Sequence, residues 1–551
     1  MLNFDPRKKY LTMKGLMMDY QLTLPTILRR AETLFGHKEI ATRLPDRTIH
    51  RYTYNNFAVR TKKLMIALQQ LGVKEGDRVA TLCWNHYQHL EIYFAVPCSG
   101  AVLHTLNLRL SPDDLEYIVN HAEDKVIIVD QILLPLFYKF RDKIKVKKII
   151  VIPNANQPVP DGMLNYEDLL TPSDISNFQF LELDENSAAA MCYTSGTTGR
   201  PKGVLYSHRS IVLHSLVSAF ADGLGIKESD IVLPVVPMFH VNAWGFPFTC
   251  TMVGAKQVFP GPYLDPPSLL ELFESERVTI TGGVPTIWLG ILNLLDADPK
   301  KYKLDSLRCL LVGGSAAPRA MIQGFEERHK LNVLHAWGMT ETSPLGTVGV
   351  LTSEILKAPK DVQFDYRAKQ GIPSSFVEIR GRSEEEFIPW DGATMGELEL
   401  RGPWIAKAYY NTPDEEQKFT EDGWFRTGDI VTIDEKGYIE IKDRTKDVIK
   451  SGGEWISSVA MEGVLMGHPA VAEAAVVAIA DEKWTERPLA CIVLKEGKQT
   501  TAEELHKFLE PHFAKFWLPD AYEFVKEIPK TSVGKFKKSA LREKFKDYQK
   551  R

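Results

Sequence analysis

The sequence predicts a large N-terminal α/β domain of packed mixed and parallel sheets with a β-rich subdomain, followed by a small α+β C-terminal domain. Three observations support this fold class. A chain of 551 residues is too long for one hydrophobic core. Short apolar runs such as RVATLCWN, KVIIVD and KKIIVIP alternate with helical patterns, which predicts parallel sheets with crossover helices. Near residue 440 this alternation ends, and a shorter unit of ordinary domain size follows.

The helices and strands of the first part follow from their patterns. YNNFAVRTKKLMIALQQLG and SPDDLEYIVNHAED show helical spacing of apolar residues. Ser111 precedes acidic residues in the second of these and is expected to cap its N-terminus. The segments DIVLPVVP, VTITGGVP and LRCLLVGGSAAP repeat the strand pattern. The strand–helix alternation that predicts parallel sheets therefore repeats along this part of the chain.

The segments before residue 443 are typical of strands and turns. GELELRGPWIAKAYY and GWFRTGDIVTIDEKGYIEIKDR predict a β-rich region, with DEKG as a hairpin turn. We expect one domain over residues 1–443 and a second over residues 444–551. No Pro- or Gly-rich linker separates them, so the joint at DRTKD suits a hinge better than a tether.

The composition excludes several classes of protein. The net charge of -4 provides no bulk field for nucleic acid or a membrane surface. The six cysteines are scattered without a C-x-x-C pair, which argues against zinc and against a disulfide framework. The first residues lack the apolar core of a signal peptide, and no run approaches the ~18 apolar residues of a membrane span. A cytoplasmic protein without nucleic-acid partners and without a transmembrane segment is therefore expected.

The stretch YTSGTTGRPKGV, residues 193–204, predicts a phosphate-binding loop. Its glycines allow backbone N–H groups to approach an anion, its hydroxyls donate further hydrogen bonds, and Lys202 adds a charge. The order of residues differs from a Walker A loop. A flexible surface loop is the alternative, but the apolar strand before it and the Arg-Pro-Lys-Gly after it favour phosphate binding.

The loop resembles the signature of the adenylate-forming superfamily of acyl-CoA synthetases, luciferases and nonribosomal peptide adenylation domains. Further segments resemble the family's motifs in the expected order, and the closest resemblance is to bacterial and archaeal medium- or long-chain fatty acyl-CoA synthetases. These segments are VPMFHVNAW (236–244), GGSAAP (313–318), AWGMTE (336–341), WFRTGD (424–429), DRTKDVIKSGGEWIS (443–457) and PKTSVGK (529–535). The resemblance implies a mobile C-terminal domain and a two-step reaction. A carboxylate attacks ATP to give acyl-adenylate and pyrophosphate, and coenzyme A then displaces AMP.

The resemblance assigns the phosphate end of the site. Lys202 stands behind the β- and γ-phosphates, and Mg²⁺, which prefers hard oxygen ligands, is expected on Glu341 and the Thr194 hydroxyl. A helix-start acid is the alternative for Glu341. The loop residues that hold the phosphates are Thr194, Ser195, Gly196, Thr197, Thr198 and Gly199.

The resemblance also assigns the nucleoside. Trp337 stacks on adenine, Asp429 accepts hydrogen bonds from the ribose hydroxyls, and Arg444 contacts ribose or phosphate. The alternatives are a core aromatic for Trp337 and a turn residue for Asp429. Further nucleotide contacts are expected from Gly314, Ser315, His335, Ala336, Gly338 and Thr340.

Lys535 in T-S-V-G-K is the expected catalytic cation, because it can neutralise charge between carboxylate and α-phosphate. The other basic residues of the tail, including Lys537 and Lys538, are expected on a solvated helix face. Lys446 occupies the hinge position of the family. The residues after the hinge, expected to meet nucleotide or the pantetheine arm of coenzyme A in one domain orientation, are Lys450, Ser451, Gly452, Gly453 and Trp455.

The acyl group is expected against His240, Val241, Asn242 and Trp244, with Trp244 as a gate between the ATP and acyl pockets. Neighbouring apolar segments favour a fatty acid, since each buried CH₂ contributes ~0.8 kcal/mol. A CoA ligase for aryl or other acids, an acyl-adenylate ligase for a carrier protein and a non-catalytic nucleotide-binding scaffold remain as alternatives. A homodimer is also expected from the resemblance.

Overall fold

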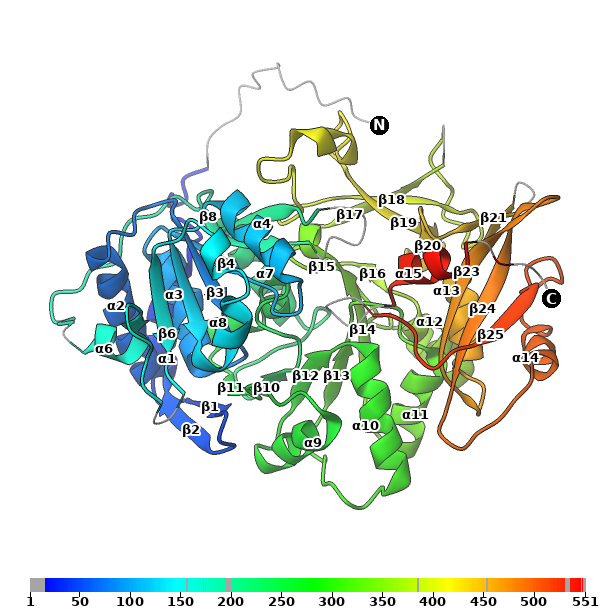
Figure 1. Cartoon of the computed structure of the whole chain (residues 1–551), viewed down its shortest axis with the longest axis horizontal. Helices are drawn as coiled ribbons and strands as arrows, with labels where there is room; N and C mark the ends of the chain where they lie inside the picture. Colours follow the sequence, from blue (N-terminus) through cyan, green and yellow to red (C-terminus); the bar gives the residue numbers. More distant parts are fainter. Residues whose placement is uncertain are drawn as a thin grey trace.

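The computed structural model describes residues 15–154, 157–171, 173–194, 200–383, 386–451, 454–530, 536–546 and 548. The large N-terminal part holds two sheets on either side of a helical layer, and the C-terminal part lies beside it (Figure 1). The expected combination of a large α/β part and a small α+β part is confirmed.

A nine-stranded sheet forms one side of the large part. The strands expected from DIVLPVVP, VTITGGVP and LRCLLVGGSAAP are neighbours in it and run parallel, as predicted. Pairs at the two ends of the sheet are antiparallel, so the sheet is mixed. In spatial order its strands are β16 (Ile372–Pro373), β15 (Leu345–Val348), β14 (Val333–Gly338), β13 (Cys309–Val312), β12 (Ile280–Gly283), β10 (Ile231–Pro234), β11 (Lys256–Phe259), β1 (Glu39–Arg43) and β2 (Ile49–Thr53).

A seven-stranded sheet forms the other side. It is parallel except for the final pair, in which β8 and β9 form a hairpin around residues 194–202. The hairpin therefore presents the expected phosphate loop at the edge of a sheet. In spatial order the strands are β7 (Leu164–Asn165), β6 (Lys148–Ile152), β5 (Val126–Asp130), β3 (Arg78–Leu82), β4 (Val102–Thr105), β8 (Ala188–Tyr193) and β9 (Gly203–Ser207).

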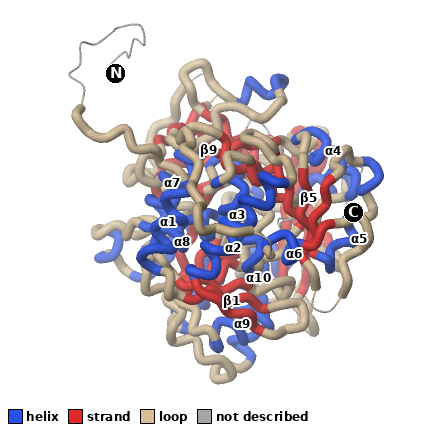
Figure 2. Tube along the Cα trace, turned by 90° about the vertical axis from the view of Figure 1, so that its left-hand side faces the viewer, coloured by secondary structure: helices blue, strands red, loops and turns tan. Residues whose placement is uncertain are grey.

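Helices α1, α2, α3 and α8 lie between the two sheets, as the view from the side shows (Figure 2), and their apolar residues join those of both sheets in one core. Ser111 caps α4 by accepting a hydrogen bond from Asp114 N, as expected. The helices are α1 (Leu24–Phe35), α2 (Tyr54–Gln70), α3 (Tyr87–Cys98), α4 (Pro112–Ala122), α5 (Leu134–Phe137), α6 (Tyr166–Leu170), α7 (His208–Ala219), α8 (Phe246–Val253), α9 (Pro266–Ser275), α10 (Pro285–Ala297), α11 (Arg319–His329) and α12 (Lys360–Ala368), with 3₁₀ turns at η1 (Gln131–Leu133), η2 (Arg141–Lys143) and η5 (Ile355–Lys357).

The β-rich region is a four-stranded antiparallel sheet with its own small core. The DEKG segment turns between its last two strands: Gly437 N donates to Asp434 O, and Gly437 takes a φ of +81°, which glycine tolerates without strain. The strands are β17 (Glu378–Arg382), β18 (Gly396–Arg401), β19 (Phe425–Ile433) and β20 (Ile439–Arg444).

The C-terminal part folds around a separate five-stranded sheet with apolar clusters on both faces. Helix α13 also contacts β20, so the two parts meet at the end of the β-rich sheet. Its strands are β21 (Ile449–Ser451), β22 (Glu454–Ile456), β23 (Val471–Asp481), β24 (Thr485–Leu494) and β25 (Ala521–Phe524), and its helices are α13 (Ser458–Leu465), α14 (Ala502–Leu509) and α15 (Lys538–Lys544).

Candidate active site

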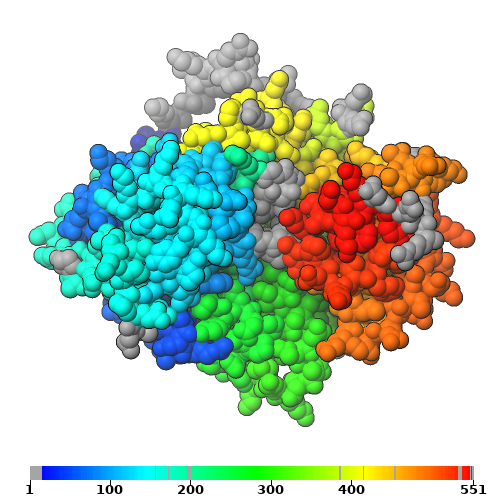
Figure 3. Space-filling view, viewed as in Figure 1, coloured from blue at the N-terminus to red at the C-terminus, as the bar shows by residue number. Residues whose placement is uncertain are grey.

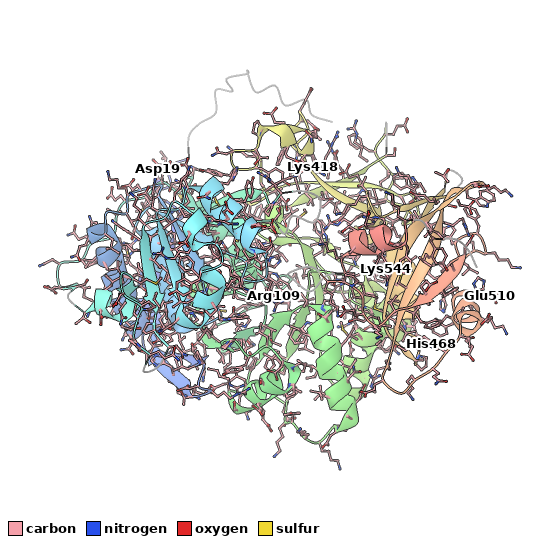
Figure 4. All side chains as sticks on the ribbon, viewed as in Figure 1. Asp19, Arg109, Lys418, His468, Glu510 and Lys544 are labelled. Atoms are coloured by element: carbon pink, nitrogen blue, oxygen red, sulfur yellow. The ribbon has the colours of Figure 1, made fainter. Side chains whose placement is uncertain are left out.

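A cavity of about 660 Å³ lies where the two sheets of the large part, the β-rich sheet and the C-terminal part meet. Such a volume is ordinary for a small-molecule site. In the space-filling view the red and orange C-terminal residues face the blue and green N-terminal part across this junction (Figure 3). Lys418, which lines the cavity, and Lys544 of α15 come from the two sides of the junction (Figure 4).

The phosphate loop is fixed at both of its ends. Thr194 N donates to Lys202 O over 2.9 Å, and Lys202 N donates to Thr194 Oγ1 over 3.1 Å. Both residues line the cavity. Ser195, Gly196, Thr197, Thr198 and Gly199 lie outside the described residues, but β8 and β9 bring their flanks to the cavity.

Lys202 forms an ion pair with Glu415 of the 3₁₀ segment η6 (Pro413–Lys418), at 2.5 Å. Its ammonium group also lies 5.2 Å from the centre of the Tyr409 ring. The expected phosphate-binding cation is therefore held between a carboxylate and an aromatic face, and all three side chains line the cavity.

Glu341 lies in the 3₁₀ turn η4 (Thr340–Thr342) and is only 5 % exposed. Its Oε1 accepts a hydrogen bond of 2.5 Å from the Tyr409 hydroxyl. Its other oxygen, Oε2, accepts no hydrogen bond from any of the described residues, and the side chain lines the cavity together with Thr194. A carboxylate oxygen and a hydroxyl facing one cavity fit the hard-oxygen preference of Mg²⁺.

Trp337, Asp429 and Arg444 lie together. The indole Nε1 of Trp337 donates to Asp429 Oδ2 over 3.1 Å, and Arg444 Nε lies 2.7 Å from Asp429 Oδ1. The register of the β-rich sheet explains the second contact, because Asp429 of β19 and Arg444 of β20 are paired residues. Asp429 is 1 % exposed and does not itself line the cavity, whereas Trp337 and Arg444 do.

The other expected nucleotide residues divide into two groups. Gly314, Ala336, Gly338 and Thr340 line the cavity. Ser315 is exposed beyond it, and His335 is buried and hydrogen-bonded through Nδ1 to Ala368 O over 3.2 Å. Burial lowers the pKa of His335 to about 4, so the ring is neutral at pH 7. The position of His335 gives no support to the predicted adenine contact.

The acyl-motif residues form an unusual turn, η3 (Val241–Gly245). Val241 to Trp244 take φ angles from +38° to +54°, a left-handed run that costs ~1–2 kcal/mol per residue. The turn places Trp244 against the backbone just after β13, since a Cβ on Gly313 would lie 3.0 Å from the indole ring. His240, Val241 and Trp244 line the cavity with Leu224, Leu311 and Leu345.

Asn242 was expected to contact the acyl group, but its side chain does not line the cavity. Its Oδ1 accepts a hydrogen bond of 2.9 Å from the buried Cys192 thiol, two residues before the phosphate loop. Asn is one of the few residue types that enter the left-handed region readily. This geometry favours a role for Asn242 in holding the turn rather than in contacting the acid.

The C-terminal side of the cavity is formed by Phe536, Lys537, Lys538, Ser539 and Arg542, together with Lys446, the residue expected at the hinge. Lys535, Gly452 and Gly453 lie outside the described residues. The flanks of residues 531–535 are fixed, because Lys530 and Phe536 form a β-bridge. Lys450, Ser451 and Trp455 do not line the cavity in this arrangement; Ser451 is buried and accepts a hydrogen bond from Arg487.

Lys538 corrects the prediction of a solvated basic face for the tail. It is 9 % exposed, and its ammonium group lies 2.7 Å from Glu462 Oε1 and 2.5 Å from Ser458 Oγ. Ser458 in turn donates through its backbone N to Asp443 Oδ2 over 2.8 Å, which ties α15 and α13 to β20. Lys537 is exposed, as expected. A charge pattern alone does not separate two adjacent lysines, and only the packing of α15 against α13 does.

Sequence reasoning also missed three residues that shape the site. Tyr409 and Glu415 hold Glu341 and Lys202 as described above, yet neither belongs to a motif used in the prediction. Gly346 of β15 leaves room for the indole of Trp337, because a Cβ there would lie 2.5 Å from the ring. A glycine within the strand pattern LGTV was the available signal of a close approach.

One cluster of metal-ligating side chain types lies elsewhere among the described residues, where ligand atoms of Cys83, His86 and Asp130 lie within 4.8 Å of one another. His86 Nδ1 accepts from His89 N, so its proton is on Nε2 and is donated to Asp130 over 2.8 Å. The Cys83 thiol donates to Ile128 O. These hydrogen bonds account for the cluster as structural. No helix in the described part of the chain has the length and apolar character needed to cross a membrane.

Comparisons with known proteins identify the family of the chain. The AMP-binding enzyme family model matches residues 31–410, and the model of the AMP-binding enzyme C-terminal domain matches residues 460–535. A long-chain-fatty-acid–CoA ligase of Thermus thermophilus is 51 % identical over 535 residues, covering 97 % of each chain. A 3-methylmercaptopropionyl-CoA ligase of Ruegeria lacuscaerulensis is 43 % identical, covering 97 % of this chain and 99 % of the relative. A medium-chain-fatty-acid–CoA ligase of Ectopseudomonas oleovorans is 42 % identical, covering 97 % and 98 %.

Among solved structures, the anthranilate CoA ligase AuaEII in complex with anthranoyl-AMP has a TM-score of 0.85 at 26 % identity, covering 95 % of this chain and 97 % of that chain. The fatty acyl CoA synthetase of Mycobacterium tuberculosis has a TM-score of 0.71 at 27 % identity, covering 96 % and 99 %. The chain therefore belongs to the AMP-binding enzyme family, within the adenylate-forming superfamily.

Proposed function

We propose that the protein is an AMP-forming fatty acid–CoA ligase, which activates a medium- or long-chain fatty acid with ATP and transfers the acyl group to coenzyme A. One observation carries the proposal. A single cavity joins a polar end formed by Thr194, Lys202 and Glu341 to an apolar end formed by Val241, Trp244 and their leucine neighbours. A carboxylate with an apolar tail and a polyphosphate can therefore meet in it.

In the first half-reaction, Lys202 and the 194–199 loop are proposed to hold the β- and γ-phosphates. Asp429 binds the ribose hydroxyls after Arg444 moves aside, and Trp337 stacks on adenine. Glu341 and Thr194 would hold Mg²⁺, which supplies charge neutralisation at the phosphates when bound. Two anions must approach each other, so oriented cations lower the barrier more than a protein base would.

Lys535 is proposed as the cation at the reacting carboxylate and α-phosphate. The bridge between Lys530 and Phe536 supports this role, because it fixes both flanks of the segment and Phe536 lines the cavity. We place the domain boundary between Asp443 and Arg444, where the four-stranded sheet ends and the five-stranded sheet follows.

For the second half-reaction, we propose that the C-terminal domain turns about Lys446. Gly452 and Gly453 would then admit the pantetheine arm, and Lys450, Ser451 and Trp455 would approach the nucleotide. In the present arrangement Lys450 and Trp455 lie away from the cavity, and the segment with Phe536 and Arg542 lines it instead. A rotation of the domain that replaces one segment by the other is compatible with these positions.

A ligase for a shorter or functionalised acid is the second candidate, because a 3-methylmercaptopropionyl-CoA ligase is 43 % identical to the chain. An acid panel separates the two. Acids from acetate to oleate, 3-methylmercaptopropionate and aromatic acids are supplied with ATP and Mg²⁺, and pyrophosphate release is measured before and after coenzyme A is added.

The proposal expects the highest kcat/KM with medium- or long-chain acids and thioester formation with coenzyme A. Preference for 3-methylmercaptopropionate favours the second candidate. Adenylate without thioester indicates another acceptor, such as a carrier protein. No pyrophosphate with any acid refutes the ligase. We also propose that the protein is cytoplasmic, which cell fractionation tests. We propose in addition that it is a homodimer, which sedimentation tests.

A further inference from the structure

The Tyr409 side chain contacts both charged groups at the phosphate end of the cavity. Its hydroxyl donates to Glu341 Oε1 over 2.5 Å, and its ring centre lies 5.2 Å from the Lys202 ammonium group. The backbone of the same segment is also attached to Glu341, because Ala406 N donates to Glu341 O over 2.8 Å. Phe419 packs edge-on against the Tyr409 ring at 5.7 Å. The tyrosine is therefore held in place between the carboxylate and the cation.

The hydrogen bond divides the two oxygens of Glu341. Oε1 accepts the hydrogen bond from Tyr409. Oε2 accepts none from the described part of the chain, and the side chain lines the cavity. The phenolic O–H of Tyr409 is the donor in this bond, and the carboxylate oxygen of Glu341 accepts. A carboxylate held through one oxygen presents the other in a fixed direction, which pre-organises it for a cation.

Lys202 has two partners of different kinds. Glu415 is an ion-pair partner at 2.5 Å whose place phosphate oxygens can take, because both are anionic acceptors. The Tyr409 ring is a neutral partner that remains when the anion is exchanged. The ring thus keeps the ammonium group at the cavity in both states.

We propose that Tyr409 is the positioning residue of the phosphate end, which orients Glu341 for Mg²⁺ through its hydroxyl and Lys202 for phosphate through its ring. The inference rests on the proposed function, since it assigns to Glu341 and Lys202 the roles given there. Tyr409 acts on the reaction through these two residues and does not touch the reacting atoms.

Three variants separate the two contacts. Tyr409→Phe removes the hydroxyl and keeps the ring, and Tyr409→Leu removes both. Tyr410→Phe is the matched control, because it makes the same chemical change next door, where the described contacts are the His121 ring and a backbone hydrogen bond to Gly203. Thermal unfolding of each variant verifies that it is folded.

The direct readout is binding of Mn²⁺, as a probe for Mg²⁺, by electron paramagnetic resonance in the presence of a non-hydrolysable ATP analogue. For Tyr409→Phe we expect the Mn²⁺ dissociation constant to rise about tenfold, the usual effect of losing a hydrogen bond to a charged group. Metal-free binding of pyrophosphate should stay unchanged in this variant. For Tyr409→Leu, metal-free pyrophosphate binding should be about threefold weaker than in the wild type, because the cation–π contact with Lys202 is lost.

Wild-type Mn²⁺ affinity in Tyr409→Phe, or an equal loss in Tyr410→Phe, overturns the inference. Pyrophosphate release by the wild-type enzyme tests the proposed function separately. Release together with a normal Tyr409→Phe variant refutes the positioning role alone. Tyr409-dependent metal binding without release for any acid refutes the ligase alone. No Mn²⁺ binding to the wild type with the ATP analogue refutes both.

Discussion

Two carboxylate–cation pairs lie at the cavity. In both the carboxylate is buried, but the pairs differ in how much of the cation's side chain is exposed to solvent. Asp429 pairs with Arg444, whose side chain is 39 % exposed, whereas Glu462 pairs with Lys538, whose side chain is 10 % exposed. Asp429 shares its oxygens with an indole and a guanidinium group that both line the cavity. Glu462 Oε1 instead accepts from Lys538 and from the backbone N of Val476, over 2.7 Å each.

This difference indicates in which pair a ligand can replace the cation on the carboxylate. Arg444 is partly exposed and can turn to water once another donor, such as a ribose hydroxyl, takes its place on the buried Asp429. Lys538 cannot leave Glu462 without leaving a buried charge unpaired, which costs ~3–5 kcal/mol. The first pair suits a ligand site in which a ribose diol replaces a guanidinium group. The second suits a permanent support for the chain around Phe536.

The first prediction concerns Lys535, which directly precedes Phe536 and lies close in sequence to Lys538 of the Glu462–Lys538 pair. Lys535→Ala should lower the rate of adenylation by about 10²–10³-fold, the usual effect of losing one charge-stabilising donor in a transition state. Preformed acyl-adenylate should still be converted to thioester. Pyrophosphate release and thioester formation are measured separately, and an equal loss in both refutes the proposed role.

The second prediction tests the sealed pair. Lys538→Met should lower kcat for adenylation by up to about 10²-fold, because a shift of the neighbouring segment misplaces the reacting groups. It should also lower the thermal midpoint, since Glu462 loses its cation. Lys544→Met, at an exposed position of the same helix that does not line the cavity, is the control. If the two variants behave alike, the support has no functional part.

The third prediction tests the exchangeable pair. Asp429→Asn should raise KM for ATP roughly tenfold, because the amide accepts ribose hydrogen bonds less strongly than a charged carboxylate. The thermal midpoint and KM for the acid should change little. Steady-state kinetics with each substrate varied in turn measure this, and a large fall in the thermal midpoint instead would make the pair structural.

The fourth prediction concerns the pH dependence of stability and expects no effect on catalysis. Burial raises the pKa of Glu462 to about 7 despite its lysine partner. The folded state then binds this proton more tightly than the unfolded state does. The contribution of Glu462 to the free energy of unfolding therefore falls as pH rises from about 4.5 to about 7, by about 1.4 kcal/mol per pKa unit. Glu462→Gln should flatten the thermal midpoint over this range, and a profile parallel to wild type contradicts the assignment.

The sequence predicted the fold class and several of the segments that line the cavity, because both leave local signals. Strand–helix alternation gave the parallel sheets, and the glycine–hydroxyl loop and AWGMTE mark segments that line the cavity. The supports of these segments left no such signal. Tyr409 meets Glu341 across 68 residues of sequence, and Lys538 meets Glu462 across 76, so only the packed chain brings them together. Lys538 looked like one more charge on a basic helix because pattern does not report burial.

The left-handed turn from Val241 to Gly245 has a consequence for engineering a different acid preference. Its backbone leaves few allowed substitutions, since β-branched residues are disfavoured at positive φ. Most substitutions in a mutant library directed at this motif would therefore unfold or displace the turn. The facing side chains Leu224, Leu311 and Leu345 carry no such restriction. A redesign of chain-length preference therefore has more freedom across the cavity from the motif than within it.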